Sequence, residues 1–238
     1  ILNEYEPLLG VRETKSAQYN RERPVLLNDA ARKKEYKDCF TMVKGAGEFL
    51  NDRTLYPALA GVQTNLYKNF VEKSWDLHGD EGVVALIHEE GIYTDSEGGS
   101  LRENFYFRLK AHYQFVNKFP MFKDVKANKP FSINIYGAKK EVIDFVHISN
   151  LYHPKTLEQI LNSSFYSDFV PGLRDEEGKT ELRGHPSRKI SINQNALKTV
   201  ASLFDPDSIV TESKLPSIHS QFAFNIIDRI GSQRSTLS

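Results

Sequence analysis

The spacing of hydrophobic and polar positions changes several times between residues 82 and 137. Residues 83–87 form an apolar run without polar alternation, which predicts a central strand buried on both faces, as in a parallel sheet. Apolar residues then recur at every fourth position from Leu101 to Leu109, the spacing of a helix that packs on a sheet. Ser100 and Glu103 form a capping-box pattern, which predicts a helix from Ser100 to about His112. A strand, a polar loop and a helix in this order predict one unit of an α/β sheet.

Two further strands are predicted after this helix, at 113–119 and 131–136. Phe131, Ile133 and Ile135 alternate with polar residues, which is the period of a strand with two different faces. The segment 122–130 between the two strands is rich in lysine. We therefore expect a β-hairpin with a long, basic tip.

The rest of the chain shows mainly helical patterns. Asn28 or Asp29, Asn65 and Asn193 can cap helices that run to about residues 43, 77 and 204. Prolines predict the first residues of two more helices, at 154–161 and 216–230, and short strands are expected at 142–148 and 189–192. The expected fold is α/β, with a strand-rich segment at 1–150 and a smaller α+β segment of helices and loops at 151–238.

Composition and charge exclude some classes of protein and leave others open. Lys+Arg and Asp+Glu both number 31, so nucleic-acid binding must depend on local patches of charge. Cys39 is the only cysteine, which excludes an internal disulfide and a cysteine-based zinc site, and the histidines show no metal-ligand spacing. No apolar run reaches the roughly 18 residues of a membrane span. We expect a cytoplasmic protein without a metal or a membrane partner, and a fragment of a longer polypeptide.

Several long strings of residues resemble one family of enzymes. They are Gly91–Glu103, Gln114–Asn117 and Lys129–Gly137, together with Gln63–Lys68, Gly172–Glu176 and Arg183–Arg188 outside the central region. These strings resemble the second half of the catalytic domain in large bacterial DNA adenine-N6 methyltransferases of fused restriction-modification and phage-defence systems. The resemblance extends from about Phe49 onward. It implies the C-terminal half of a Rossmann-like methyltransferase sheet, mixed and with a terminal β-hairpin, and a segment that leads toward a DNA-recognition region.

The chemical motifs of this family are absent from the chain. The family holds adenine with an Asn-Pro-Pro-aromatic motif, which does not occur here, and it holds S-adenosylmethionine with a glycine-rich turn after a strand. Gly45 and Gly47 lie inside a helical pattern without a strand before them. The resemblance places both motifs upstream of Ile1. It therefore implies S-adenosylmethionine as the cofactor of a parent protein, no cofactor-binding residues in this fragment, and no activity of the fragment alone.

The resemblance implies that this region supplies the pocket for a target base that has flipped out of double-stranded DNA. Phe122 matches the position of the family's base-stacking aromatic residue, and Phe119 is the second choice; for both, a place in the core is the alternative. The neighbouring Lys123, Lys126 and Lys129 are candidates for phosphate contacts, although solvated loop lysines are commoner. The other candidate DNA contacts are Arg183, His185 and Arg188.

Glu89 and Glu90 follow the predicted central strand, at the edge where α/β sheets bind ligands. Glu89 is a third candidate for contact with the base. The simpler expectation is that one carboxylate turns outward and the other braces the loop. A hydrolase that uses both carboxylates is a distant alternative, and a non-catalytic DNA- or protein-interaction or specificity module is a closer one. The remainder of a parent polypeptide and double-stranded DNA are the expected partners.

Overall fold

The computed structural model of the 238-residue chain describes residues 2–7, 16–79, 81–119, 121–162 and 169–234. The chain forms two compact units, Ile1–Leu55 and Tyr56–Ser238. The first unit contains α1 (Leu2–Tyr5), α2 (Ser16–Leu26) and α3 (Ala30–Leu50). The side chain of Asp29 accepts a hydrogen bond from the Arg32 N–H at 2.9 Å, which confirms the predicted start of α3. Gly45 and Gly47 do not interrupt the helix, and its apolar residues Phe40 and Val43 are exposed.

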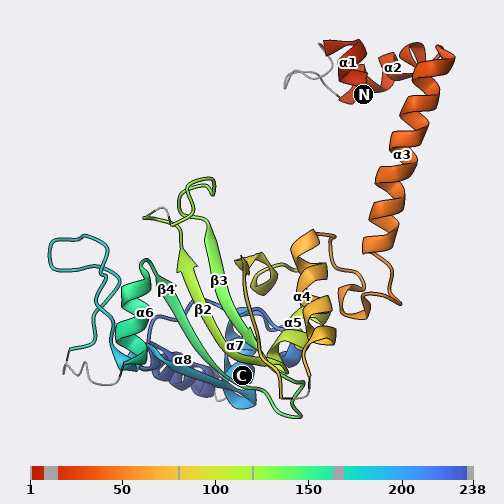
Figure 1. Cartoon of the computed structure of the whole chain (residues 1–238). Helices are drawn as coiled ribbons and strands as arrows, with labels where there is room; N and C mark the ends of the chain where they lie inside the picture. Colours follow the sequence, from red (N-terminus) through yellow and green to blue (C-terminus); the bar gives the residue numbers. More distant parts are fainter. Residues whose placement is uncertain (1, 8–15, 80, 120, 163–168, 235–238) are drawn as a thin grey trace. The chain divides into compact units, whose positions relative to one another are not determined.

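The second unit is built on a five-stranded mixed sheet with the strand order β1-β3-β2-β4-β5 (Figure 1). The strands are β1 (Val84–Glu89), β2 (Leu109–Val116), β3 (Pro130–Tyr136), β4 (Asp144–Leu151) and β5 (Ile190–Asn193). β3 is antiparallel to both β1 and β2, β2 is parallel to β4, and β4 is antiparallel to β5. The fold is therefore α/β with an open mixed sheet, consistent with the later half of a Rossmann-like sheet, and the β2–β3 hairpin is confirmed.

Five helices and four short 3-10 turns surround this sheet in the described residues. The helices are α4 (Leu66–Leu77), α5 (Gly99–Tyr106), α6 (Pro154–Leu161), α7 (Gln194–Phe204) and α8 (Gln221–Arg234). The turns are η2 (Pro57–Leu59), η3 (Glu90–Tyr93), η4 (Pro186–Arg188) and η5 (Val210–Glu212). Asn65 and Asn193 cap α4 and α7 as predicted, and Pro154 begins α6. α8 begins at Gln221, after the predicted Pro216, and continues beyond Gly231.

The prediction of a central strand at 83–87 is wrong, because β1 lies at an edge of the sheet. Among the described residues only β3 pairs with β1, and Ile87 is 58% exposed. An apolar run shows that a strand suits burial on both faces. It carries no information on whether neighbouring strands and helices are present to provide that burial.

The predicted capping box is also wrong. Ser100 Oγ donates to the carbonyl oxygen of Ala58 at 3.1 Å, and the Glu103 carboxylate accepts from Thr211 Oγ1 at 3.0 Å. Partners from distant segments have therefore replaced the two local hydrogen bonds that the pattern offered. α5 starts at Gly99 and ends at Tyr106, and Leu109 already belongs to β2. α5 does pack on the sheet as predicted, with Leu101 and Phe105 fully buried.

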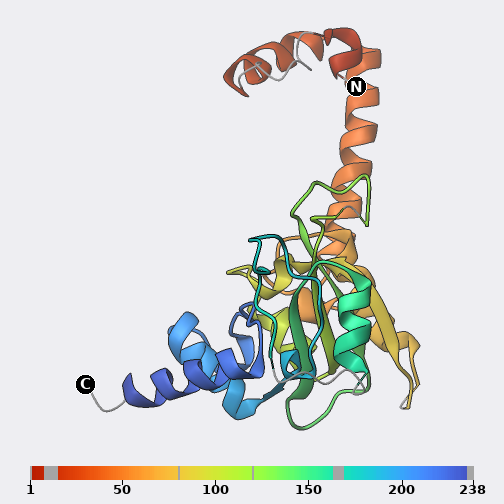
Figure 2. The same ribbon diagram turned by 90° about the vertical axis from the view of Figure 1, so that its left-hand side faces the viewer.

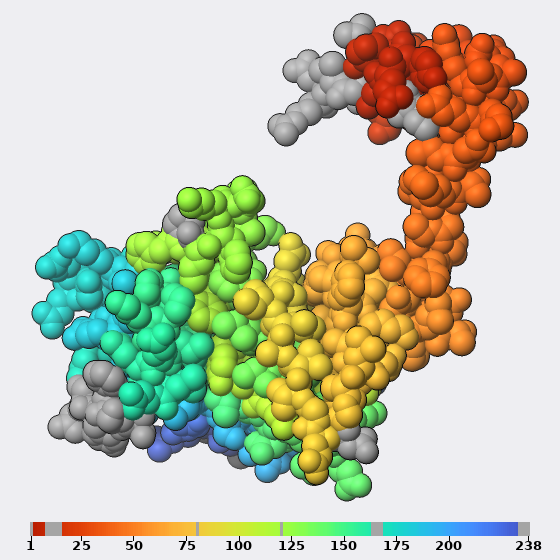
Figure 3. Space-filling model, viewed as in Figure 1, coloured from red at the N-terminus to blue at the C-terminus, as the bar shows by residue number. Residues whose placement is uncertain are grey.

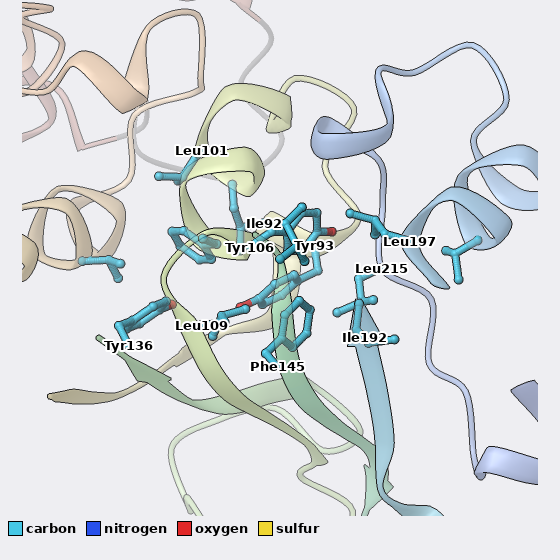
Figure 4. Close-up of a cluster of buried hydrophobic side chains, with 14 of the residues drawn as sticks. Ile92, Tyr93, Leu101, Tyr106, Leu109, Tyr136, Phe145, Ile192, Leu197 and Leu215 are labelled. Carbon is cyan, nitrogen blue, oxygen red and sulfur yellow. The ribbon is translucent and has the colours of Figure 1, made fainter. Parts of the chain in front are cut away.

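The main hydrophobic core lies on one face of the sheet, where α4, α5 and α7 contribute side chains (Figure 4). Phe105 contacts Trp75 and Tyr136 edge to face, with ring centroids 5.5 Å and 5.3 Å apart. A second, smaller cluster lies on the opposite face, where Ile160 of α6 covers Phe115 and Ile148. Residue 150 lies within β4, and the division into segments 1–150 and 151–238 stays a prediction.

Candidate functional site

A pocket of about 410 Å³ lies between the end of β1 and the loop that joins β2 to β3. This loop extends past the ends of the strands and reaches the surface of the second unit (Figures 2 and 3). The antiparallel register sets Glu89 opposite Phe131, so these two side chains lie on the same face of the sheet. The pocket is lined by Ile87, His88, Glu89, Phe122, Asp124, Val125, Lys126, Lys129, Pro130 and Phe131. It brings together four predicted site residues: Glu89, Phe122, Lys126 and Lys129.

Phe122 is anchored on one side and open on the other. Its ring meets Phe131 edge to face at 5.1 Å, and Phe131 in turn stacks on Phe115 at 5.4 Å. The Phe122 side chain is nevertheless 40% exposed, and it lines the pocket. Phe119 is exposed as well but is not among the residues that line the pocket. The arrangement leaves part of a packed aromatic ring available to a ligand.

His88 forms part of the pocket wall, although nothing in the sequence pointed to it. Its Nε2 lies 2.9 Å from Tyr136 Oη, its Nδ1 lies 2.9 Å from the Glu89 carbonyl oxygen, and its ring stacks on Tyr67 at 5.3 Å. Burial lowers the pKa of His88 to about 4, so the imidazole is neutral at physiological pH. A lone histidine in an apolar strand gives no sequence signal that separates this role from simple burial.

The charged groups at the pocket are mixed in sign. Lys126 and Lys129 line it together with Glu89 and Asp124, whereas Lys123 is exposed in the same loop and is not a lining residue. Within the described part of the chain, none of these three lysines forms an ion pair. Three ammonium groups are therefore available for an external anion beside a wall that also carries carboxylates.

Glu89 and Glu90 point to opposite sides, as the simpler expectation predicted. Glu89 lines the pocket, whereas Glu90 is buried, with a carboxylate oxygen 3.1 Å from His112 Nε2 and another contact to Gln114 Nε2 at 3.3 Å. His112 Nδ1 lies 2.8 Å from His147 Nδ1. Glu90 therefore braces the turn that follows β1, and the two carboxylates do not form the pair that a hydrolase would need.

The three basic candidates near residue 185 lie away from the pocket, and two of them are buried. Arg188 donates hydrogen bonds to the carbonyl oxygens of Ser149 at 2.7 Å and Asn150 at 3.0 Å, and burial lowers its pKa to about 10. His185 caps η4 by accepting from the Ser187 N–H at 3.1 Å. Arg183 is exposed but holds the Glu181 carboxylate at 2.6 Å, which lowers the pKa of Glu181 to about 2. We leave all three outside the candidate interface, because two of them are buried and the third is paired with Glu181. Loop position and charge alone did not indicate this burial and pairing.

Neither glycine pair in the described residues forms a glycine-rich turn after a strand that could hold S-adenosylmethionine. Gly45 and Gly47 lie inside α3, so they do not form a turn after a strand. Gly98 and Gly99 begin α5, but a carboxylate oxygen of Glu212 lies 2.6 Å from where a Cβ of Gly99 would be. The N-terminus of α5 is therefore already covered by an acidic side chain.

In the described ranges there is no group of three metal-ligating side chains, and no helix is long and apolar enough to cross a membrane.

No protein-family model matches the chain, and no curated protein matches it. Among solved structures, the type IIG restriction endonuclease BpuSI aligns with 68% of this chain and 17% of its own, at 17% identity and a TM-score of 0.39. The ATP-dependent type ISP restriction-modification enzyme LlaBIII bound to DNA aligns with 56% of this chain and 11% of its own, at 15% identity and a TM-score of 0.32. This chain thus spans less than a fifth of either protein. At these scores neither likeness determines a function.

Proposed function

We propose that this chain is part of a site-specific, S-adenosylmethionine-dependent DNA adenine-N6 methyltransferase of a restriction-modification or phage-defence system. The chain supplies the pocket for the target base and loops that face DNA. The observation that carries this proposal is the pocket itself, where Phe122, Glu89, Lys126 and Lys129 meet at the end of an edge strand. The resemblance of the sequence to this family names the reaction.

The pocket has the groups that a flipped adenine requires. A base that leaves the DNA stack loses its stacking partners, and the partly exposed Phe122 ring offers a replacement. The Glu89 carboxylate can accept a hydrogen bond from the exocyclic amino group, and the neutral His88 does not repel the base. Lys126 and Lys129 line the same pocket, and in this proposal they contact the phosphates on either side of the flipped nucleotide.

The uncovered edge of β1 supports a role within a larger polypeptide. In the part of the chain that the structure describes, β1 pairs with β3 alone, and Ala85 and Ile87 on one of its faces are exposed. A bare apolar edge strand is a site for pairing with another strand. In this proposal the rest of the parent adds strands at this edge and brings the Asn-Pro-Pro-aromatic motif beside Glu89. S-adenosylmethionine, when bound by that part, supplies the methyl group, and the complete enzyme acts in the cytoplasm.

The decisive experiment starts with the gene upstream of the codon for Ile1. We expect it to encode a glycine-rich cofactor turn and an Asn-Pro-Pro-aromatic motif, and we expect the complete protein to transfer tritiated methyl groups to adenine in DNA. A complete gene without both motifs would refute the proposal. It would favour the alternative of an interaction or specificity module that carries no catalytic role.

Replacing Phe122 with alanine in the complete enzyme should weaken binding of the flipped base by about 1 to 3 kcal/mol, the usual contribution of base stacking. Methyl transfer should fall by roughly a factor of 5 to 150. The thermal midpoint should change little, because the ring is only partly buried. Phe119→Ala is the matched control, since Phe119 is exposed in the same loop but does not line the pocket. Equal losses of methylation in both variants would contradict base stacking by Phe122.

Neutralising Lys123, Lys126 and Lys129 to glutamine should weaken DNA binding for all sequences alike. Each lysine that contacts a phosphate contributes about 0.9 to the slope of log affinity against log salt, so the slope should flatten by up to about 3. The measurement is fluorescence anisotropy with duplex DNA at several salt concentrations. The control replaces the exposed Lys33, Lys37 and Lys44 of α3. An unchanged slope in the first variant would mean that the loop does not approach DNA.

A further inference from the structure

Asn117 is a fully buried polar residue at the start of the loop that carries Phe122. Its side-chain amide nitrogen donates to the carbonyl oxygens of Phe122 and Val125, both at 3.0 Å. Its side-chain oxygen accepts from the backbone N–H of Met121 at 3.0 Å and of Phe122 at 3.3 Å. One side chain therefore satisfies four backbone groups of the loop, two of them on Phe122.

The backbone of Asn117 joins the two ends of the same loop. Its N–H donates to the Lys129 carbonyl oxygen at 3.0 Å, and its carbonyl oxygen accepts from the Asn128 N–H at 3.2 Å. Asn128 has a φ of 65°, a left-handed conformation that asparagine tolerates better than most residues. The loop thus returns to its starting residue before β3 begins at Pro130. Such closure limits the positions that the Phe122 backbone can take.

We propose that Asn117 is the positioning residue for Phe122, holding its backbone so that the ring already faces the pocket before a base arrives. The purpose of this positioning rests on the proposed function. The hydrogen bonds that hold the Phe122 backbone are independent of that function. A loop ordered in the free protein does not have to be ordered during binding, so less of the binding free energy is lost. Without the asparagine, four backbone groups of the loop would lose the side chain that they share, and the loop would rearrange.

Asparagine is the side chain that these contacts require. Aspartate has a similar shape and keeps the acceptor for Met121 and Phe122, but it loses both N–H donors and sets a negative charge against two carbonyl oxygens. Alanine removes all four side-chain hydrogen bonds. Asn117→Asp therefore tests the two hydrogen bonds that the side chain donates, and Asn117→Ala tests all four side-chain hydrogen bonds together.

The test is amide hydrogen exchange on the full chain, read at Met121 and Phe122. In the unmodified protein these two amides should exchange at least tenfold more slowly than that of the exposed Lys123, because they donate to the Asn117 side chain. Asn117→Ala should remove this protection, whereas Asn117→Asp should reduce it. Asn134→Ala is the control: Asn134 is equally buried, in β3, and bonds Tyr93 and Ser132 instead of the loop.

Two results would overturn the inference. The first is rapid exchange of the Met121 and Phe122 amides in the unmodified chain. This measurement does not depend on the folding of any variant. The second is an effect of Asn117→Ala on these amides no larger than that of Asn134→Ala. If the Met121 and Phe122 amides are protected as expected but the complete protein does not methylate DNA, Asn117 still positions Phe122 and the proposed function is rejected.

A double-mutant cycle in the complete enzyme distinguishes positioning from general stability. If Asn117 acts through Phe122, Asn117→Asp should reduce methyl transfer at least tenfold in the normal protein and less than about twofold when Phe122 is already alanine. A purely structural asparagine would give the same factor in both backgrounds. That outcome would reject the positioning role even if the exchange results agree with it.

Discussion

Replacing Arg102 with methionine should lower the free energy of unfolding of the second unit by about 3 to 5 kcal/mol. Arg102 in α5 is 1% exposed, and its guanidinium donates to the carbonyl oxygens of Ile92 at 2.9 Å, of Glu212 at 2.8 Å and of Asp95. It therefore joins η3, the loop before α5 and η5 to one helix. Methionine has a similar length but no donor, so buried carbonyl oxygens would be left without their partner.

Urea unfolding followed by the fluorescence of Trp75 measures this effect. Trp75 is the only tryptophan, and its ring packs against Phe105. Phe105 and Arg102 both lie in α5. Lys179→Met is the control, because the ion pair of Lys179 with Glu177 is exposed on both sides and should contribute no more than about 1 kcal/mol. Similar losses for the two variants would show that the three carbonyl oxygens find other partners when Arg102 is absent.

The features that sequence predicted correctly depend on residues close together in the chain. Asp29, Asn65 and Asn193 each accept a hydrogen bond from a backbone N–H two or three residues later, so the cap and its helix lie in one short window. The β2–β3 hairpin follows from alternation in adjacent segments. Phe122 came from a resemblance, and Lys126 and Lys129 from their place beside it in the same loop. The structure sets all three on one pocket, and their roles stay predictions.

The features that sequence missed depend on distant segments. Ser100 offered a local cap, but the Ala58 carbonyl, 42 positions earlier, accepts its hydrogen bond instead. Arg188 looked like a surface contact and became the donor for two carbonyl groups of β4. Asn117 lies in one of the strings that carry the resemblance, but nothing there indicated its role, because that role arises from how the loop returns to it. The residues that hold a site in place are thus harder to read from sequence than the residues that face its ligand.

Acid should destabilise the second unit well before its carboxylates are protonated. Burial lowers the pKa of His88 from its ordinary value of 6.5 to about 4, and burial together with the nearby His112 lowers that of His147. The unfolded chain binds a proton at each of these histidines below about pH 6.5, whereas the folded chain binds one at His88 only near pH 4. Stability should therefore be constant above about pH 6.5, fall between the two values, and level off for His88 below about pH 4.

The expected loss at pH 5 relative to pH 7 is about 2 kcal/mol for His88, and the lowered pKa of His147 adds to this loss. Glu72 acts in the opposite direction, because burial raises its pKa and the folded state takes up its proton first. Glu181 does not contribute in this range, since its pKa is lowered to about 2 and its stabilisation disappears only in stronger acid. The negative charge of Glu90 favours the protonated form of His88, which limits the loss but does not reverse the depressed pKa.

His88→Gln separates the contribution of this residue from that of His147. Glutamine does not titrate, so the free energy of unfolding should fall by about 2 kcal/mol less between pH 7 and pH 5 than in the unmodified chain. Some stability is lost at every pH, because the hydrogen bond to Tyr136 and the stacking on Tyr67 are altered. The difference between the two pH values, measured by urea unfolding, is independent of that constant loss. Parallel curves for the two proteins would show that His88 is protonated equally easily in the folded and unfolded states.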